Sequence, residues 1–147
     1  MRISVQEEPF DLGAEARAFA GGRRDMGAVV TFTGVVRDDP AQPLERMVIE
    51  HYPGMTEKAL TEIAEQALAR WSLGDLLIIH RFGEMMPGEQ IMMVATAARH
   101  RRDAFEAAEF LMDYLKSRAP FWKKEHRAEG AGWVAARDAD EDALARW

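Results

Sequence analysis

The feature that most constrains the fold is the run from Met55 to Trp71, in which apolar residues recur at helical spacing. Those residues are Leu60, Ile63, Ala64, Ala67, Leu68 and Trp71. A helix with a single apolar stripe needs a second layer on which that stripe can pack. The preceding "PG" and the following "SLGD" bound the helix, and Thr56 is its expected N-cap.

Four runs of strand-forming residues supply the second layer. They are 27–37 (GAVVTFTGVVR), 45–52 (ERMVIEHY), 76–82 (LLIIHRF) and 90–97 (QIMMVATA). The first two flank a proline-broken polar loop, "DDPAQPL". The last two are joined by "GEMMPGE", whose glycines and proline suit a tight connection, so we expect these two strands to pair.

A second helix is expected to begin near Asp103, with Glu106 completing a capping box. Its predicted buried stripe consists of Phe105, Ala108, Leu111, Met112 and Leu115. Pro120 biases the residue before it away from helical angles, so the helix should end at Ser117 or Arg118. The closing "DADEDALARW" fits either a short helix or a mobile tail.

The segment order strand, strand, helix, strand, strand, helix predicts an α+β fold with helices packed on a largely antiparallel sheet. A chain of 147 residues with 48% hydrophobic content is long enough for one core, so residues 1–147 are expected to form a single domain.

Several classes of function are disfavoured by composition. No apolar run approaches the roughly 20 residues of a membrane span, and the N-terminus lacks a signal-peptide core, so we expect a cytoplasmic protein without a membrane partner. The absence of cysteine excludes a persulfide or a thiolate nucleophile on this chain. A net charge of -6 argues against nucleic-acid binding. The four histidines show no metal-ligand spacing, and we expect no metal and no cofactor; His51 and His80 read as hydrogen-bonded structural residues.

Positive charge is nevertheless concentrated in one region. Residues 99–127 contain eight Lys/Arg against five Asp/Glu, which leaves a local excess of cations on an acidic protein. A solvated helix face would explain such a region as well as an anion-binding site would. The candidate cations lie in three places along the chain: Arg37 after the first strand, His100 and Arg101 before the second long helix, and Lys116 to Lys124 after it. Spacing alone does not show that these places converge.

Five segments carry a resemblance to a known family: "GAVVTFTGVVRD", "EHYPGMTEKAL", "HRFGEMMPGE", "RHRRDAFEAAEFLMDYLKSRAPFWKKE" and "WVAARDAD". Together they resemble the large, catalytic subunit of molybdopterin synthase, the MoaE family. The block "MDYLKSRAPFWKKE" is the most specific of them. The resemblance implies an α/β hammerhead-like domain with an added small antiparallel sheet.

The resemblance also implies an activity. The family transfers sulfur from the C-terminal thiocarboxylate of a small ubiquitin-like subunit, of the MoaD family, to cyclic pyranopterin monophosphate (precursor Z). The product is molybdopterin, a step in molybdenum cofactor biosynthesis. The large subunit forms a homodimer with one small subunit at each end, a heterotetramer. An alternative of another class is a non-catalytic dimeric module that binds a phosphate-bearing ligand or a partner tail with the same cations.

The resemblance assigns residues to this chemistry. Lys116 and Lys123 match the catalytic lysines, with Lys123 the better candidate for proton transfer because it lies beyond the helix. The implied substrate-binding residues are Val35, Val36, Arg37, His100, Arg101, Lys116, Lys123, Lys124 and Glu125. Phe32 and Met112 are equally compatible with pocket wall and core. Phe121 and Trp122 are expected to fix Lys123 by packing, and Arg137 is a weaker candidate from a neighbouring subunit.

Overall fold

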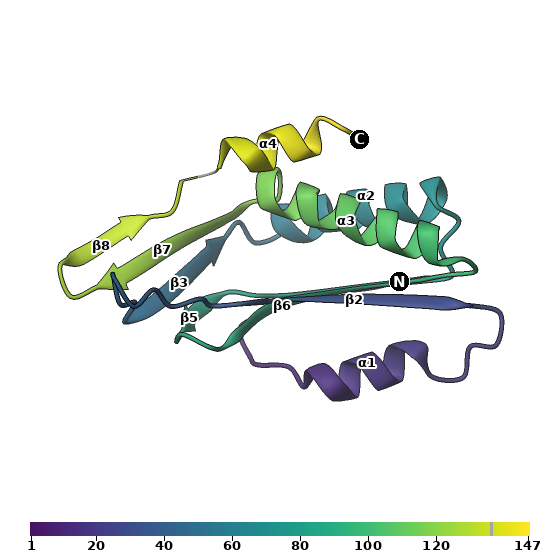
Figure 1. Ribbon diagram of the computed structural model, residues 1–147, viewed down its shortest axis with the longest axis horizontal. Coiled ribbons are helices and arrows are strands. Elements are labelled where there is room, and N and C mark those ends of the chain that lie inside the picture. The colour runs from purple at the N-terminus through teal and green to yellow at the C-terminus, as the bar shows by residue number, and fades with distance from the viewer. Residues whose placement is uncertain (136) are drawn as a thin grey trace.

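The computed structural model describes residues 1–135 and 137–147 and contains two four-stranded sheets (Figure 1). The larger sheet has the order β1-β4-β6-β2, formed by β1 (Arg2–Gln6), β4 (Asp75–Arg81), β6 (Gln90–Ala98) and β2 (Ala28–Val35). The smaller sheet has the order β5-β3-β7-β8, formed by β5 (Gly83–Met85), β3 (Arg46–His51), β7 (Phe121–Arg127) and β8 (Gly130–Trp133). All pairs except the parallel β1–β4 pair are antiparallel, which confirms the predicted α+β fold.

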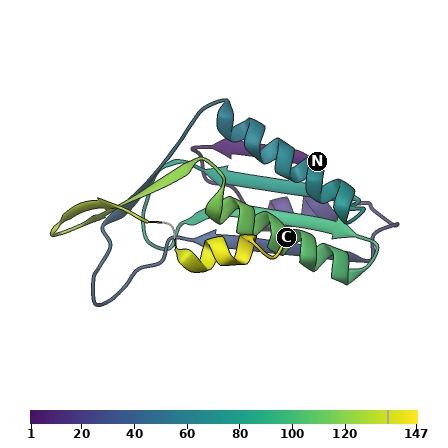
Figure 2. The ribbon, with the colours of Figure 1, turned by 90° about the horizontal axis from the view of Figure 1, so that it is seen from above.

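Helices cover both faces of the larger sheet (Figure 1). α1 (Leu12–Ala20) lies on one face, α2 (Met55–Arg70) and α3 (Arg101–Ser117) lie on the other, and α4 (Asp138–Leu144) packs on α3. The main core lies between the sheet and α2 and α3, and a smaller apolar cluster lies under α1. Viewed from above, the β7–β8 hairpin extends beyond the helical layer (Figure 2). None of the helices in the described part of the chain has the length and apolar character of a membrane span.

The four predicted strands and both long helices are present, and β4 pairs with β6 as expected. The α1, β1, β5, β7 and β8 elements were not predicted. β7 has the sequence "FWKKEHR", which reads as a cationic segment because its apolar members do not dominate either face. β5 has only three residues and lies inside the predicted connection, where its pairing with β3 is what makes it a strand.

Two predicted helix caps are wrong. α2 is capped by Gly54, whose N–H donates to the Glu57 carboxylate (2.7 Å), while the buried Thr56 hydroxyl donates to the Tyr52 carbonyl (2.8 Å). The second helix begins at Arg101, two residues earlier than expected near Asp103, with His100 at the N-cap position.

The predicted stripe of α3 is wrong at Phe105. That side chain is 61% exposed, and the buried residues are Ala104, Ala107, Ala108, Phe110, Leu111 and Leu115. The alanines face β6, and their small size lets the helix approach closely enough for the Thr96 hydroxyl to donate to the Ala104 carbonyl (2.7 Å). The end at Ser117 is confirmed.

The C-terminal residues form a helix that packs along α3. Arg146 donates to Asp113 (2.8 Å) and Glu109 (2.9 Å), and Arg118 of the α3 C-cap pairs with Glu141 (2.7 Å). The Trp147 ring meets Phe110 edge-on at 5.6 Å and donates to Asp113 (2.6 Å). These contacts hold α4 beside the C-terminal end of α3, where the candidate lysines lie.

Candidate active site

Lys123 points from β7 toward the protein interior. In the antiparallel register Phe121, Lys123 and Glu125 lie opposite His51, Ile49 and Met47 of β3. Directly opposed residues share one face of a sheet. Ile49 is only 1% exposed, so the face that carries Lys123 is the one turned toward the core.

This position shifts the protonation of Lys123. Burial and, to a smaller extent, the positive charge of Lys116 lower the pKa of its amine to about 8, although Asp140 and Glu125 act in the opposite direction. Desolvation and a like charge both disfavour the ammonium form. The amine therefore exchanges its proton close to neutral pH, as a general acid or base requires.

Lys116 occupies the last turn of α3 and is exposed. Its charge acts on both Lys123 and His80, which places its amine near the same spot. The two lysines thus come from a helix end and from the strand that follows it, joined by the short turn at Ala119 and Pro120.

Two histidines lie beneath the lysines, and both are hydrogen-bonded as expected. His51 Nδ1 is 3.1 Å from the Thr56 hydroxyl. His80 is buried, its Nδ1 is 2.8 Å from the Arg81 carbonyl oxygen, and its ring stacks on Phe121. Burial, followed by the charges of Lys123, Lys116 and His51, lowers the pKa of His80 to about 3. His80 is therefore neutral near neutral pH.

The buried amine should reduce stability. We expect Lys123→Met to raise the free energy of unfolding at pH 7 by up to about 3 kcal/mol, because a pKa lowered from 10.5 to about 8 penalises the folded ammonium form. The unfolded chain binds the extra proton between pH 8 and 10.5, so wild-type stability rises with pH in that window. Urea denaturation at equal protein concentration should show the gain shrinking toward pH 10.5.

The exposed Lys58 offers a matched control for this experiment. Lys58→Met should change the free energy of unfolding by less than about 0.5 kcal/mol at either pH, as is usual for surface positions. A Lys123→Met protein no more stable than wild type at pH 7 would mean that the ammonium is well solvated and that its pKa is ordinary.

The neighbours of Lys123 in sequence point the other way. Lys124 lies on the opposite face of β7, where its amine is 5.2 Å from the centre of the Trp133 ring. Trp122 shares that outer face and is 49% exposed, so the expectation that it packs against Lys123 is wrong. Phe121 does lie on the inner face, as expected. Strand alternation separates residues that a helix or loop could have kept together.

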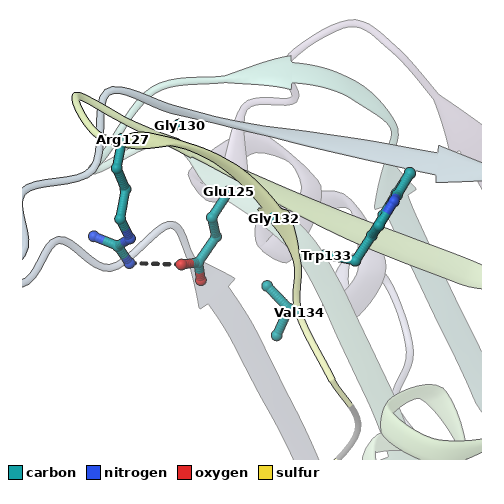
Figure 3. A pocket seen from close by; sticks show the side chains of 6 residues that line it. All are labelled: Glu125, Arg127, Gly130, Gly132, Trp133 and Val134. Carbon is teal, nitrogen blue, oxygen red and sulfur yellow. Dashed lines mark hydrogen bonds and ion pairs between the residues drawn. The ribbon is translucent and has the colours of Figure 1, made fainter.

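A cavity of about 310 Å³ lies on the β7–β8 hairpin (Figure 3). It is lined by Glu125, Arg127, Gly130, Gly132, Trp133 and Val134. A Cβ added at either glycine would meet no atom within 4 Å, so the missing side chains leave this face open. Glu125 is held by Arg127 (2.5 Å), and the Trp133 ring points away from this ion pair (Figure 3).

The end of β2 lies at the same end of the larger sheet as Lys116, because α3 turns back over β6 after the Arg99–His100 connection. Val36 is buried, with its N–H on the Glu89 carbonyl (2.9 Å) and its own carbonyl accepting from Gly88 (2.8 Å). Val35 and Arg37 are exposed beside it. Arg37 thus lies at the end of the sheet where the lysines lie, and within residues 1–135 and 137–147 its guanidinium forms no salt bridge.

His100 and Arg101 are not brought to the lysines within one chain. They begin α3, and roughly 22 Å of helix, at 1.5 Å per residue, separates Arg101 from Lys116. Figure 1 shows α3 running from one end of the sheet toward β7. The two groups of candidate residues therefore lie at opposite ends of the same helix.

The remaining candidates occupy the surface or the core margin. Phe32 is 43% exposed on β2 and is not a core residue, whereas Met112 is half-buried against the main core. Arg137 is exposed at the N-cap of α4. Among the described residues, no cluster of three His, Asp or Glu side chains is arranged to hold a metal ion. Sequence reasoning missed the proximity of Asp140 to Lys123, for which spacing gave no signal.

Comparison with known proteins places this geometry in context. The family model described as MoaE protein matches residues 5–118. The molybdopterin synthase catalytic subunit of Cereibacter sphaeroides is 66% identical over 147 residues, the full length of both chains. The MoaE protein structure from Burkholderia ambifaria MC40-6 superposes with a TM-score of 0.84 at 52% identity, covering 99% of this chain and 96% of that one. The crystal structure of molybdopterin synthase from Staphylococcus aureus gives a TM-score of 0.83 at 29% identity, covering 92% and 98%.

Proposed function

The chain belongs to the MoaE family, and from that premise we propose that Lys116 and Lys123 form the centre at which it transfers sulfur in molybdenum cofactor biosynthesis. The chain is the catalytic subunit of a molybdopterin synthase and acts with a small ubiquitin-like subunit. The thiocarboxylate of that subunit delivers sulfur to cyclic pyranopterin monophosphate, which becomes molybdopterin. The reaction is that of a cytoplasmic sulfurtransferase built on a single domain.

The observation that carries this assignment is the lowered pKa of Lys123, about 8. At pH 7 roughly one amine in ten is then neutral, so the lysine is mostly an acid but is able to lose its proton. It donates to the leaving oxygen as the cyclic phosphate opens, or accepts a proton as the sulfur adds. A module that only binds an anion has no use for a lysine that gives up part of its charge. The lowered pKa of Lys123 therefore favours catalysis over the binding alternative.

Lys116 supplies a fixed charge at the same place. It is exposed at the end of α3, where a positive charge interacts favourably with the helix dipole. Its role is to stabilise the negative charge that develops on the substrate and on the attacking thiocarboxylate. The division is between a proton carrier on β7 and an electrostatic partner on α3.

Arg37 binds the phosphate of the substrate. A guanidinium forms paired hydrogen bonds with phosphate oxygens, and Arg37 is exposed at the end of β2. Val35 and Val36 precede it and line the approach to the lysines. Glu125 lines the cavity on the β7–β8 hairpin. Lys124 lies on the outer face of β7 and contributes positive charge at longer range.

His100 and Arg101 serve the site of a second copy. β2 is an edge strand of the larger sheet in the described chain, and it carries the exposed apolar side chains of Val29, Phe32 and Val35. The Phe105 side chain of α3 is exposed as well. Edge strands of this kind are usually covered, and homodimers cover them isologously.

A two-fold axis perpendicular to β2 brings the separated residues together. Ala28 at the start of β2 pairs with Ala98, close to His100, while the end of β2 leads into Arg37. Antiparallel pairing of two copies sets the start of one β2 beside the end of the other. His100 and Arg101 of one copy then approach Arg37 and Lys116 of the other, which gives two composite sites in the homodimer.

Reconstitution tests the function. The purified chain, mixed with cyclic pyranopterin monophosphate and a thiocarboxylated small subunit, is expected to form molybdopterin, detected as its fluorescent oxidation product. A small subunit lacking its two C-terminal glycines is the control and should give no product, because the sulfur must come within about 3 to 3.5 Å of the substrate carbon. Substrate binding without product from the intact partner would favour the binding module instead.

A further inference from the structure

The imidazole ring of His80 lies close to Lys116 and Lys123, on their buried side. It ends the buried face of β4 that also carries Leu76 and Ile78, and it is 5% exposed. Its ring lies nearly parallel to the Phe121 ring, with the centroids 3.6 Å apart and the planes at 15°. This is the closest of the ring contacts around β7, since His51 lies 6.2 Å from Phe121.

The orientation of this imidazole is fixed on its other edge. The Arg81 carbonyl oxygen, 2.8 Å from Nδ1, can only accept, so Nδ1 carries the proton and Nε2 is the unprotonated nitrogen of the neutral ring. Arg81 is itself buried, and its guanidinium donates to the Glu7 carbonyl (3.1 Å) and to Glu89 (3.3 Å). The ring therefore has a rigid support.

The stack acts on Lys123 through β7. Phe121 precedes Lys123 by two residues on the same face of the strand, and the two pair with His51 and Ile49 of β3. Lys123 and Lys116 both act electrostatically on His80, so the imidazole and the two amines are close neighbours. The stacked imidazole is thus a neutral ring close to both amines.

We propose that His80 is a positioning residue for Lys123: its neutral ring holds Phe121 flat against β4 and excludes water from the inner side of the lysine. The proposal rests on the role given to Lys123 above. The charged groups that act on the Lys123 amine come from neighbouring elements: Lys116 of α3, Asp140 of α4 and Glu125 of β7. Replacing His80 leaves these charges in place, so a change in the titration of Lys123 reports the effect of the stacked His80 ring alone.

The test follows the lysine directly by NMR. The chain has four lysines, so labelling with lysine carrying ¹³C at Cε gives few signals, and Lys123 is assigned by the signal missing from Lys123→Gln. We expect His80→Gln, which removes the stacked ring, to raise the titration midpoint of Lys123 by at least about half a pH unit. His80→Phe, which keeps a stacked ring but loses the Nδ1 hydrogen bond, should leave the midpoint within about 0.2 units of wild type.

His126→Gln, on the outer face of β7, is the matched control and should leave the midpoint unchanged. If His80→Gln does not fold, Phe121→Leu removes the stack from the other side and should give the same rise. The proposal would be overturned by an unchanged midpoint in His80→Gln or in Phe121→Leu. It would also be overturned by an equal shift in His80→Gln and His80→Phe, because the stacked ring would then have no effect of its own.

The pH dependence of the single-turnover rate separates this proposal from the proposed function. When the rate inflection moves together with the NMR midpoint, both stand. When the midpoint moves but the rate profile does not, the positioning by His80 stands and proton transfer by Lys123 is wrong.

Discussion

Replacing Lys123 by arginine is expected to lower the single-turnover rate of sulfur transfer at least about a hundredfold, the lower range of what general acid–base catalysis contributes. Guanidinium keeps the positive charge but remains protonated above pH 12, so it neither gives up nor accepts a proton near pH 7. The wild-type rate should show an inflection near pH 8, where Lys123 titrates, and the variant should lack it. Substrate affinity should be retained.

Lys116→Arg is the informative comparison for this prediction. Because Lys116 is assigned a fixed charge, arginine should serve there nearly as well, and this variant should keep more activity than Lys123→Arg. Lys58→Arg, on an exposed position of α2, controls for the substitution itself, and thermal melts exclude unfolding. Near-normal turnover by Lys123→Arg would show that its charge alone matters.

The second large effect is expected from mixing two inactive chains. Lys123→Ala and Arg101→Ala should each lose most activity, but dimers formed from both should recover it. In a mixed dimer one composite site lacks both residues and the other is intact. With random pairing half of the dimers are mixed, so about one quarter of all sites should function.

This recovery distinguishes a shared site from a site within one chain. If Lys123 and Arg101 of the same chain acted together, no dimer would contain an intact site, and the mixture would be no more active than its parents. Co-expression of differently tagged chains allows the mixed dimer to be isolated. The fraction of intact sites is then known from the composition of the sample and does not depend on random pairing. The same sample should show half of the wild-type activity per dimer.

Much of this protein was accessible from the sequence alone. Apolar residues at helical spacing between Met55 and Trp71 predicted α2, and Pro120 predicted the end of α3 at Ser117, because these features depend on local sterics and on one-dimensional periodicity. Five segments, of which "MDYLKSRAPFWKKE" is the most specific, together resembled the MoaE family and through it pointed to the two lysines.

Other features depended on contacts that no local rule encodes. Thr56 and Asp103 have good capping chemistry, yet the chain enters these helices through Gly54 and His100, because the ends of β3 and β6 set the entry direction. Phe105 is apolar but exposed, since the alanines of α3 fit more closely against β6.

The chemistry of the site was decided only in three dimensions. Residues 121–127 read as a cationic segment in the sequence. Only the pairing of β7 with β3 turns Lys123 inward and Lys124 outward. The sequence by itself determined which cations the chain carries and in what order. Tertiary structure decided that burial and Lys116 lower the pKa of one of them, and that α3 carries His100 and Arg101 away from it, because desolvation and distance are properties of packing rather than of spacing.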